Sequence, residues 1–189
     1  TGDSQTSEEL TCSLASYDCV TLVETALSFA LALTPQEAIS ILTQIRYSEG
    51  HIAWTARNHY MHNWITNGER HARVSRVRFR GSEKIKECTL SCIKELLAEQ
   101  ISFPYLPIDK IEDAKSKLCD GDIVLFVSER EDLDVFHVGF LFWEGETLML
   151  CHAARSQESV VYQDFDEFVS AQSMPGIVLV RPNDAGDRE

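Results

Sequence analysis

The residues best suited to chemistry are Asp18-Cys19-Val20-Thr21, at the start of an apolar stretch. A cysteine attacks a carbonyl group as its thiolate, and the free N–H groups and positive dipole end of a helix start lower the pKa of a thiol. The same N–H groups can hold an oxyanion during acyl transfer. Cys19 is therefore a candidate nucleophile, although this segment alone is equally consistent with a buried structural cysteine.

A thiol nucleophile needs a base, and two histidines lie in neighbouring strand-like segments. His137 belongs to VFHVGF and His152 to LCHAA, with a short turn between the two segments. If Glu144 and Gly145 form that turn, the strand register places His137 directly opposite His152, with Cβ atoms ~5 Å apart. Because each buried ring nitrogen needs a partner, the pairing favours a base held by a second histidine. A chance pair of core histidines is the alternative.

Helices in the first half of the chain must position Cys19. Asp18 is a suitable N-cap for a helix from about Cys19 to Leu33, which carries one apolar stripe. Thr34-Pro35-Gln36-Glu37 then combines a cap, a proline and a capping-box glutamate, which predicts a second helix. Two more helices are predicted, from Asn58 through Trp64 with Asn67-Gly68 closing it, and around Lys84 to Gln100.

The second half has the period of strands, and these must position the histidines. The short loops between most of these segments leave no room for crossover helices, so we expect a mainly antiparallel sheet and an α+β fold. We expect one catalytic domain over residues 1–189, with a polar tail at 183–189. The predicted strands are Asp122–Ser128, Asp134–Trp143, Thr147–Ala154, Ser159–Gln163 and Ile177–Arg181.

Composition excludes several classes of function. The net charge is −13, with 30 acidic and 17 basic residues, which argues against a nucleic-acid partner. No stretch approaches the ~20 apolar residues of a membrane span. Six cysteines without a CxxC pair indicate neither a disulfide scaffold nor a zinc site, so we expect no metal and no cofactor.

Several blocks of sequence, spread over roughly residues 15 to 181, resemble one enzyme family. The order Cys19, His137, His152 is that of papain-like cell-wall hydrolases of the NlpC superfamily. More narrowly, the chain resembles the N-acetylmuramoyl-L-alanine amidase-like branch of that superfamily. The blocks are DCVTLVE (18–24), IRYSEGHIAWTARNHYMHNWI (45–65), DGDIVLFV (120–127), LDVFHVGFLF (133–142) and LMLCHAA (148–154).

This resemblance implies a papain-like NlpC-type fold and hydrolysis of the amide between N-acetylmuramic acid and L-alanine in peptidoglycan or its fragments. Cys19 would attack the lactyl carbonyl, His137 would move the proton, and His152 would orient His137. The alternative is an endopeptidase that cleaves D-glutamyl–diamino acid bonds of the stem peptide. A periplasmic or secreted monomer is expected, although no signal peptide is visible.

The resemblance also suggests residues that bind substrate, each with a structural alternative. Asp18 either contacts substrate or only caps its helix, and Arg57 either binds a carboxylate or forms an ion pair within the fold. The other expected contacts are Tyr47, Asn58 and Tyr60. The 17 residues before Asp18 lack the Gly-Thr-Pro-Tyr-like segment of the branch, so part of the cleft is expected to be built differently.

Overall fold

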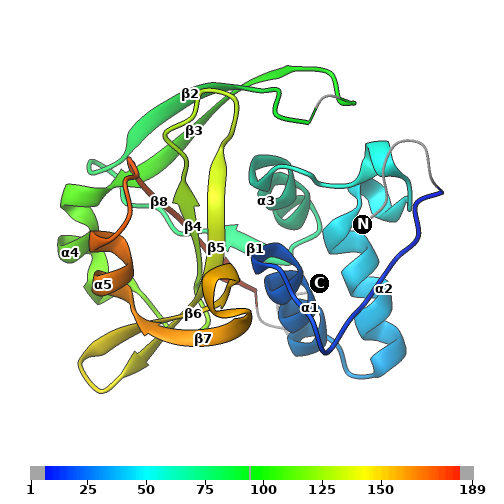
Figure 1. Cartoon of the computed structure of the whole chain (residues 1–189), viewed down its shortest axis with the longest axis horizontal. Helices are drawn as coiled ribbons and strands as arrows, with labels where there is room; N and C mark the ends of the chain where they lie inside the picture. The colour runs from blue at the N-terminus through cyan, green and yellow to red at the C-terminus, as the bar shows by residue number, and fades with distance from the viewer. Residues whose placement is uncertain (1–6, 94, 184–189) are drawn as a thin grey trace.

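A computed structural model describes residues 7–93 and 95–183, and three helices precede most of the sheet (Figure 1). The predicted polar tail therefore lies outside the described residues, apart from Asn183. The helices are α1 (Cys19–Leu31), α2 (Pro35–Arg46) and α3 (Met61–Arg70). None of the described helices combines the length and apolar character needed to cross a bilayer.

Local hydrogen bonds explain where the first two helices begin. The Asp18 carboxylate accepts from the backbone N–H of Thr21 at 2.7 Å, and the Thr21 hydroxyl accepts from the N–H of Asp18 at 2.9 Å. This reciprocal capping box fixes Cys19 as the first residue of α1. At α2, the Thr34 hydroxyl accepts from the N–H of Glu37 at 3.1 Å, and the Glu37 carboxylate accepts from the N–H of Leu33 at 2.8 Å, one residue before the predicted capping-box partner. Both starts confirm the prediction, whereas α1 ends at Leu31 rather than Leu33.

The third helix begins later than predicted and has a different cap. Asn58 donates its side-chain amide to the carbonyl of Ile45 at 2.9 Å and stands outside α3. The buried carboxylate of Asp134 instead accepts from the N–H of His62 at 2.6 Å. The cap comes from a distant part of the chain, so local sequence could not reveal it.

The described strands form one sheet in the order β2-β3-β8-β4-β5-β6-β7, with β1 also paired to β8. All of these pairs are antiparallel, which confirms the α+β class with a mainly antiparallel sheet. The strands are β1 (Val74–Arg76), β2 (Lys84–Leu90), β3 (Glu99–Pro107), β4 (Ile123–Val127), β5 (Val135–Glu144), β6 (Thr147–Ala154), β7 (Ser159–Asp164) and β8 (Gly176–Pro182). Short helices are α4 (Ile111–Ala114), α5 (Phe165–Ser170), η1 (Ser48–Gly50), η2 (Trp54–Ala56), η3 (Ile108–Lys110), η4 (Lys115–Lys117) and η5 (Arg155–Gln157).

The helix predicted around Lys84 to Gln100 is wrong, because this stretch forms β2 and the start of β3. Cys88 and Leu90 are buried on one face of β2, and Cys88 pairs with Ile101 of β3. The helix-forming residues of the intervening segment suggested a helix, but pairing with a strand further along the chain overrides that propensity.

The hairpin that carries the histidines has its turn one residue later than predicted. Glu144 pairs with Thr147, so Gly145 and Glu146 are the turn residues, and Gly145 takes a φ of 63°. The prediction that His137 and His152 face each other directly is therefore wrong, because the strand register differs by two residues. An even shift keeps both side chains on the same face of the sheet, so the histidines become diagonal neighbours.

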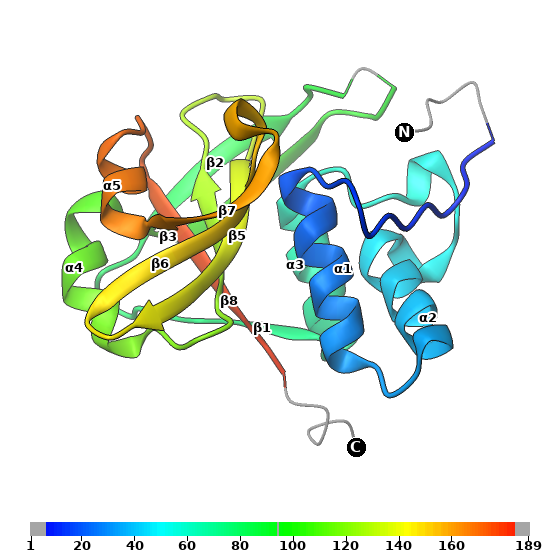
Figure 2. The ribbon, with the colours of Figure 1, turned by 60° about the horizontal axis from the view of Figure 1, so that its bottom comes forward.

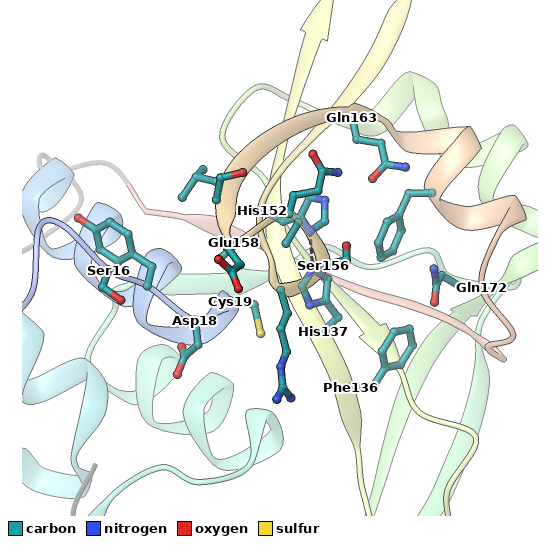
Figure 3. Close-up of a pocket in the computed structure, with 18 of the residues that line it drawn as sticks. Ser16, Asp18, Cys19, Phe136, His137, His152, Ser156, Glu158, Gln163 and Gln172 are labelled. Atoms are coloured by element: carbon teal, nitrogen blue, oxygen red, sulfur yellow. Dashed lines mark hydrogen bonds between the residues drawn. The ribbon is translucent and has the colours of Figure 1, made fainter.

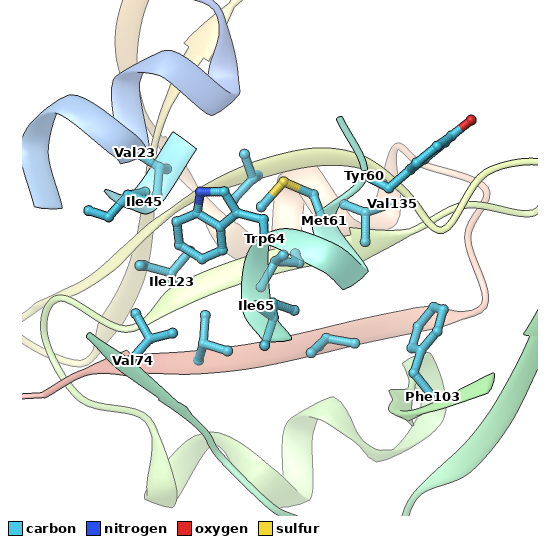
Figure 4. Close-up of a cluster of buried hydrophobic side chains, with 14 of the residues drawn as sticks. Val23, Ile45, Tyr60, Met61, Trp64, Ile65, Val74, Phe103, Ile123 and Val135 are labelled. Atoms are coloured by element: carbon cyan, nitrogen blue, oxygen red, sulfur yellow. The ribbon is translucent and has the colours of Figure 1, made fainter. Parts of the chain in front are cut away.

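Helices cover both faces of the sheet (Figures 1 and 2). Along β4, Ile123, Leu125 and Val127 belong to the core beneath α1–α3, while Val124 and Phe126 belong to the core beside α4 and α5. Figure 4 shows Trp64 of α3 at the centre of the first core. This packing fixes the start of α1 against the strands that carry the histidines.

Candidate active site

A pocket of about 1030 Å³ lies where the start of α1 meets β5 and β6 (Figure 3). All three predicted catalytic residues line it, together with Asp18. Residues 15–17 form one wall and the turn at residues 155–160 forms another. Residues 15–17, just before the capping box, thus form a wall of the cleft although they lack the Gly-Thr-Pro-Tyr-like sequence named above.

The thiol of Cys19 is partly buried at the first turn of α1. Burial and the charge of Asp18 raise its pKa, while backbone N–H groups of Val138, Val20 and Cys19 itself lower it less strongly. The net shift is upward, which corrects the expectation that a helix start alone would lower this pKa. Cys19 therefore rests as a thiol and needs a base to become reactive.

That base is available in a hydrogen-bonded pair of histidines. His137 Nε2 lies 2.7 Å from His152 Nδ1, and the two rings are almost perpendicular at 88° (Figure 3). Burial, and then the nearby His152, lower the pKa of His137 to about 4. His137 is therefore neutral at pH 7 and can accept a proton on its remaining ring nitrogen, Nδ1.

Aromatic rings surround this pair and account for its burial. The ring of Phe168 in α5 lies 5.6 Å from that of His137 and 5.2 Å from that of His152, measured between centroids. The ring of Phe126 in β4 stacks on the ring of His137, and their centroids lie 6.0 Å apart. These apolar rings disfavour the charged imidazolium form of either histidine, so both side chains stay neutral.

The thiol reaches the backbone of Val138, the residue that follows His137. Among the described residues, no hydrogen bond joins the Cys19 thiol to the His137 ring. Catalytic hydrogen bonds are often long before substrate binds. The pocket therefore contains a thiol, Cys19, and a neutral imidazole, His137, that is held by His152. These are the groups that nucleophilic acyl transfer requires.

Comparison with known proteins identifies the family of the chain. Residues 1–177 match the AmiA-like family, described as N-acetylmuramoyl-L-alanine amidase-like. The chain belongs to this amidase-like family. No protein of curated function matches the sequence.

Solved structures similar to this amidase-like protein come from several bacteria. A Bacteroides fragilis protein, provisionally named a xylanase, is 26% identical with a TM-score of 0.81, over 92% of this chain and 90% of that one. An N-acetylmuramoyl-L-alanine amidase from Bacteroides uniformis is 24% identical with a TM-score of 0.77, over 93% and 87%. A Legionella pneumophila protein has 17% identity and a TM-score of 0.77, over 88% and 75%. The similarity to the Bacteroides uniformis and Legionella pneumophila structures shows that this chain shares their fold.

Four of the residues predicted to bind substrate lie outside the lining of this pocket. The Tyr47 hydroxyl donates to Glu8 at 2.7 Å, and Arg57 lies 3.5 Å from the same carboxylate oxygen. Burial and then Glu8 raise the pKa of Tyr47 to about 12. Asn58 bonds within the fold, and Tyr60 is buried with its hydroxyl accepting from the N–H of Ile93. Their role in substrate binding stays a prediction.

Sequence did not single out Arg155, which lines the pocket, or Gly139, which packs against the strand that carries His152. Gly139 lies so close to β6 that a Cβ atom would stand 2.8 Å from the Cys151 carbonyl oxygen and 3.0 Å from the Cβ of His152. Arg155 lines the pocket and forms no ion pair within the described part of the chain. Gly139 lies within the HVG block, and Arg155 directly follows the LCHAA block, so these two blocks were the signals that could have pointed to them.

Metal-binding side chains do not gather near the pocket. Within residues 7–93 and 95–183, no three His, Cys, Asp or Glu side chains are arranged to hold an ion. Cys88 lies on β2, and Cys92 lies in the segment after it. Cys92 contacts the Tyr60 hydroxyl at 3.5 Å.

Proposed function

We infer that this protein is a cysteine-dependent amidase that hydrolyses the bond between N-acetylmuramic acid and L-alanine in peptidoglycan or its fragments. The observation that carries this inference is the His137–His152 hydrogen bond in the pocket that Cys19 enters from a helix start. The family name supports the choice of substrate. We propose that this papain-like enzyme acts as a monomer in the periplasm or outside the cell, where intact peptidoglycan is found.

In the reaction, the sulfur of Cys19 attacks the lactyl carbonyl while its proton passes to Nδ1 of His137. Because the thiol pKa is raised and the imidazole pKa is lowered, proton transfer accompanies attack rather than preceding it. N–H groups at the start of α1 are suited to the oxyanion. His137 then gives its proton to the leaving amine, and water, deprotonated by His137, releases the acid from the thioester.

The charges in the pocket suit a muropeptide. A stem peptide carries free carboxylates, and Arg155 lines the pocket without an ion pair among the described residues. A volume of about 1030 Å³ can hold a sugar and the first residues of a peptide. Arg155 would then bind the peptide side of the scissile bond.

Defined muropeptides, analysed by mass spectrometry after incubation, test the proposal. The expected products are the free sugar acid and a peptide that begins with L-alanine, with no activity in Cys19→Ala and no effect of EDTA. A sugar that retains L-alanyl-D-glutamate would instead identify the endopeptidase alternative. Loss of activity with EDTA and its recovery with zinc would contradict a mechanism that needs only thiol and imidazole.

The name given to the Bacteroides fragilis structure suggests a second class to include as a control. A glycosidase of the usual kind needs two carboxyl groups across the bond, at ~5–9.5 Å. The described acidic residues of the pocket are Asp18 and Glu158, and Asp18 is engaged in capping α1. Release of reducing ends from xylan, with Cys19→Ala still active, would overturn the amidase proposal.

A further inference from the structure

Polar side chains form a diagonal row across three neighbouring strands of the sheet. Leu150 of β6 pairs with Gln163 of β7, and His152 pairs with Val161. Facing residues and residues two apart share a face, so Gln163 lies on the same face as His152, one diagonal step away. His137 stands one diagonal step from His152 on the opposite side, in β5. Figure 3 shows Gln163 beside His152 at the pocket.

One atom in this row is left without a partner. His152 is 4% exposed, and its Nε2 has no hydrogen-bond partner among the described residues. The side chain of Gln163 nonetheless lies close enough to oppose the lowering of the His152 pKa by burial. A buried ring nitrogen without a partner is costly, and this one lies next to a carboxamide that can supply an acceptor.

The direction of proton transfer decides which group Nε2 needs. If Nδ1 of His137 is to accept the thiol proton, the proton of neutral His137 must sit on Nε2 and be donated to His152 Nδ1. His152 then carries its own proton on Nε2, which makes that atom a donor. Gln163 Oε1 is an acceptor, whereas the opposite tautomer of His152 would leave His137 unable to act as base.

We propose that Gln163 is a positioning residue whose carboxamide oxygen accepts the Nε2 proton of His152, fixing the tautomer that makes His137 a base. This inference rests on the proposed function for its catalytic consequence, but not for its structural content. Gln163 touches neither the thiol nor the scissile bond, and acts through His152. The row thus extends the catalytic group by one strand, from β6 to β7.

Nitrogen-15 spectra of protein labelled at histidine test the tautomer without any substrate, with the His152 signals assigned by comparison with His152→Asn. We expect a protonated Nε2 and an unprotonated Nδ1 at His152 in the wild-type protein. In Gln163→Leu the two tautomers should mix, while Gln163→Glu should keep Nε2 protonated. An unprotonated Nε2 in the wild-type protein overturns the proposal, whatever the variants do.

Kinetics on muropeptides test the consequence for catalysis. Removing the acceptor of a buried donor predicts a fall in kcat between about 5-fold and about 100-fold for Gln163→Leu, with KM nearly unchanged. Gln163→Glu should recover most of kcat, which loss of a packing contact would not explain. The matched control is Gln100→Leu, at an exposed position of β3.

The two proposals fail in different ways. Wild-type protein that cleaves no muropeptide, but shows the protonated Nε2 and its loss in Gln163→Leu, would refute the amidase and retain the positioning role. Cleavage with kcat in Gln163→Leu within about twofold of wild type would refute the role of Gln163 and retain the amidase.

Discussion

At the scale of single residues, the two histidines differ in what their loss removes. His137→Ala takes away the proton carrier and should lower kcat by about 10²–10⁴-fold, close to the effect of Cys19→Ala, because nucleophile and base act as a unit. His152→Ala removes orientation alone and should cost less. His152→Gln should be intermediate, since an amide oxygen can still accept the imidazole N–H. Steady-state kinetics of the purified variants measure this order, and a His152→Ala as inactive as His137→Ala would contradict it.

The low pKa of His137 predicts the pH range of activity. His137 accepts a proton only while neutral, so activity should persist below the ordinary histidine pKa of about 6.5 and fall as the pH drops through about 4. Values of kcat/KM measured from about pH 3 to about pH 8 give the acid limb. Circular dichroism at each pH separates this limb from unfolding. A limb near the ordinary histidine pKa would show that His137 is not buried as described.

Residue types and order predicted the chemical group better than its electrostatics. Sequence predicted that Asp18, Cys19 and the two histidines lie together, because a nucleophile, a base and an orienter have recognisable types and order, and all four line one pocket. Their catalytic roles stay predictions. The direction of the Cys19 pKa was missed, since burial is a property of the folded chain. Phe168 and Gln163 were missed as well, because an aromatic ring and an amide carry no signal until strand pairing brings them beside His152.

At the scale of elements, the close approach of β5 and β6 depends on Gly139. A Cβ atom there would meet backbone and the Cβ of His152 at 3.0 Å or less, so β6 would have to move. Gly139→Ala should therefore lower stability by about 1–3 kcal/mol and kcat by more than stability alone explains. Urea unfolding and kinetics of this variant measure the two effects. Gly145 has open space around it but takes a φ of 63°, so Gly145→Ala should lower stability through turn strain while leaving kcat near that of the wild type. An equal fall in kcat in the two variants would argue against a specific contact at Gly139.

The contact between α1 and α2 depends on a buried ion pair. Arg46 Nε lies 2.7 Å from Glu24, and both side chains are 3% exposed or less. Burial raises the pKa of Glu24, and Arg46 opposes that rise. Arg46→Met should cost about 3–5 kcal/mol of unfolding free energy, because it leaves a carboxylate buried alone.

The double variant Glu24→Leu/Arg46→Met is the control for this pair. It removes both charges together and should recover much of the loss, as measured by urea unfolding. Equal losses in the single and double variants would show that packing, not charge, is what Arg46 contributes.

Elements with local start signals were predicted well, and elements defined by distant partners were not. The capping box of α1 and the Thr34 cap of α2 are formed by residues close in the chain, so sequence placed both starts correctly. The segment from Lys84 to Gln100 forms strands because β2 and β3 pair, and α3 is capped by Asp134 from far along the chain. The register of the histidine hairpin differed by two residues, because Gly145 takes the first rather than the second turn position.

At the scale of the whole molecule, the proposed nucleophile, Cys19, belongs to the helical layer, and its proposed base, His137, belongs to the sheet. Hydrogen bonds within each layer do not set the distance between the Cys19 thiol and the His137 imidazole. That distance is set by the apolar packing between the helical layer and the sheet. We therefore expect that loosening of this packing would separate the thiol from the imidazole while both layers keep their secondary structure. Activity should therefore disappear at lower urea concentrations than helical circular dichroism does. Coincident loss of the two signals would mean that the layers separate only when the whole chain unfolds.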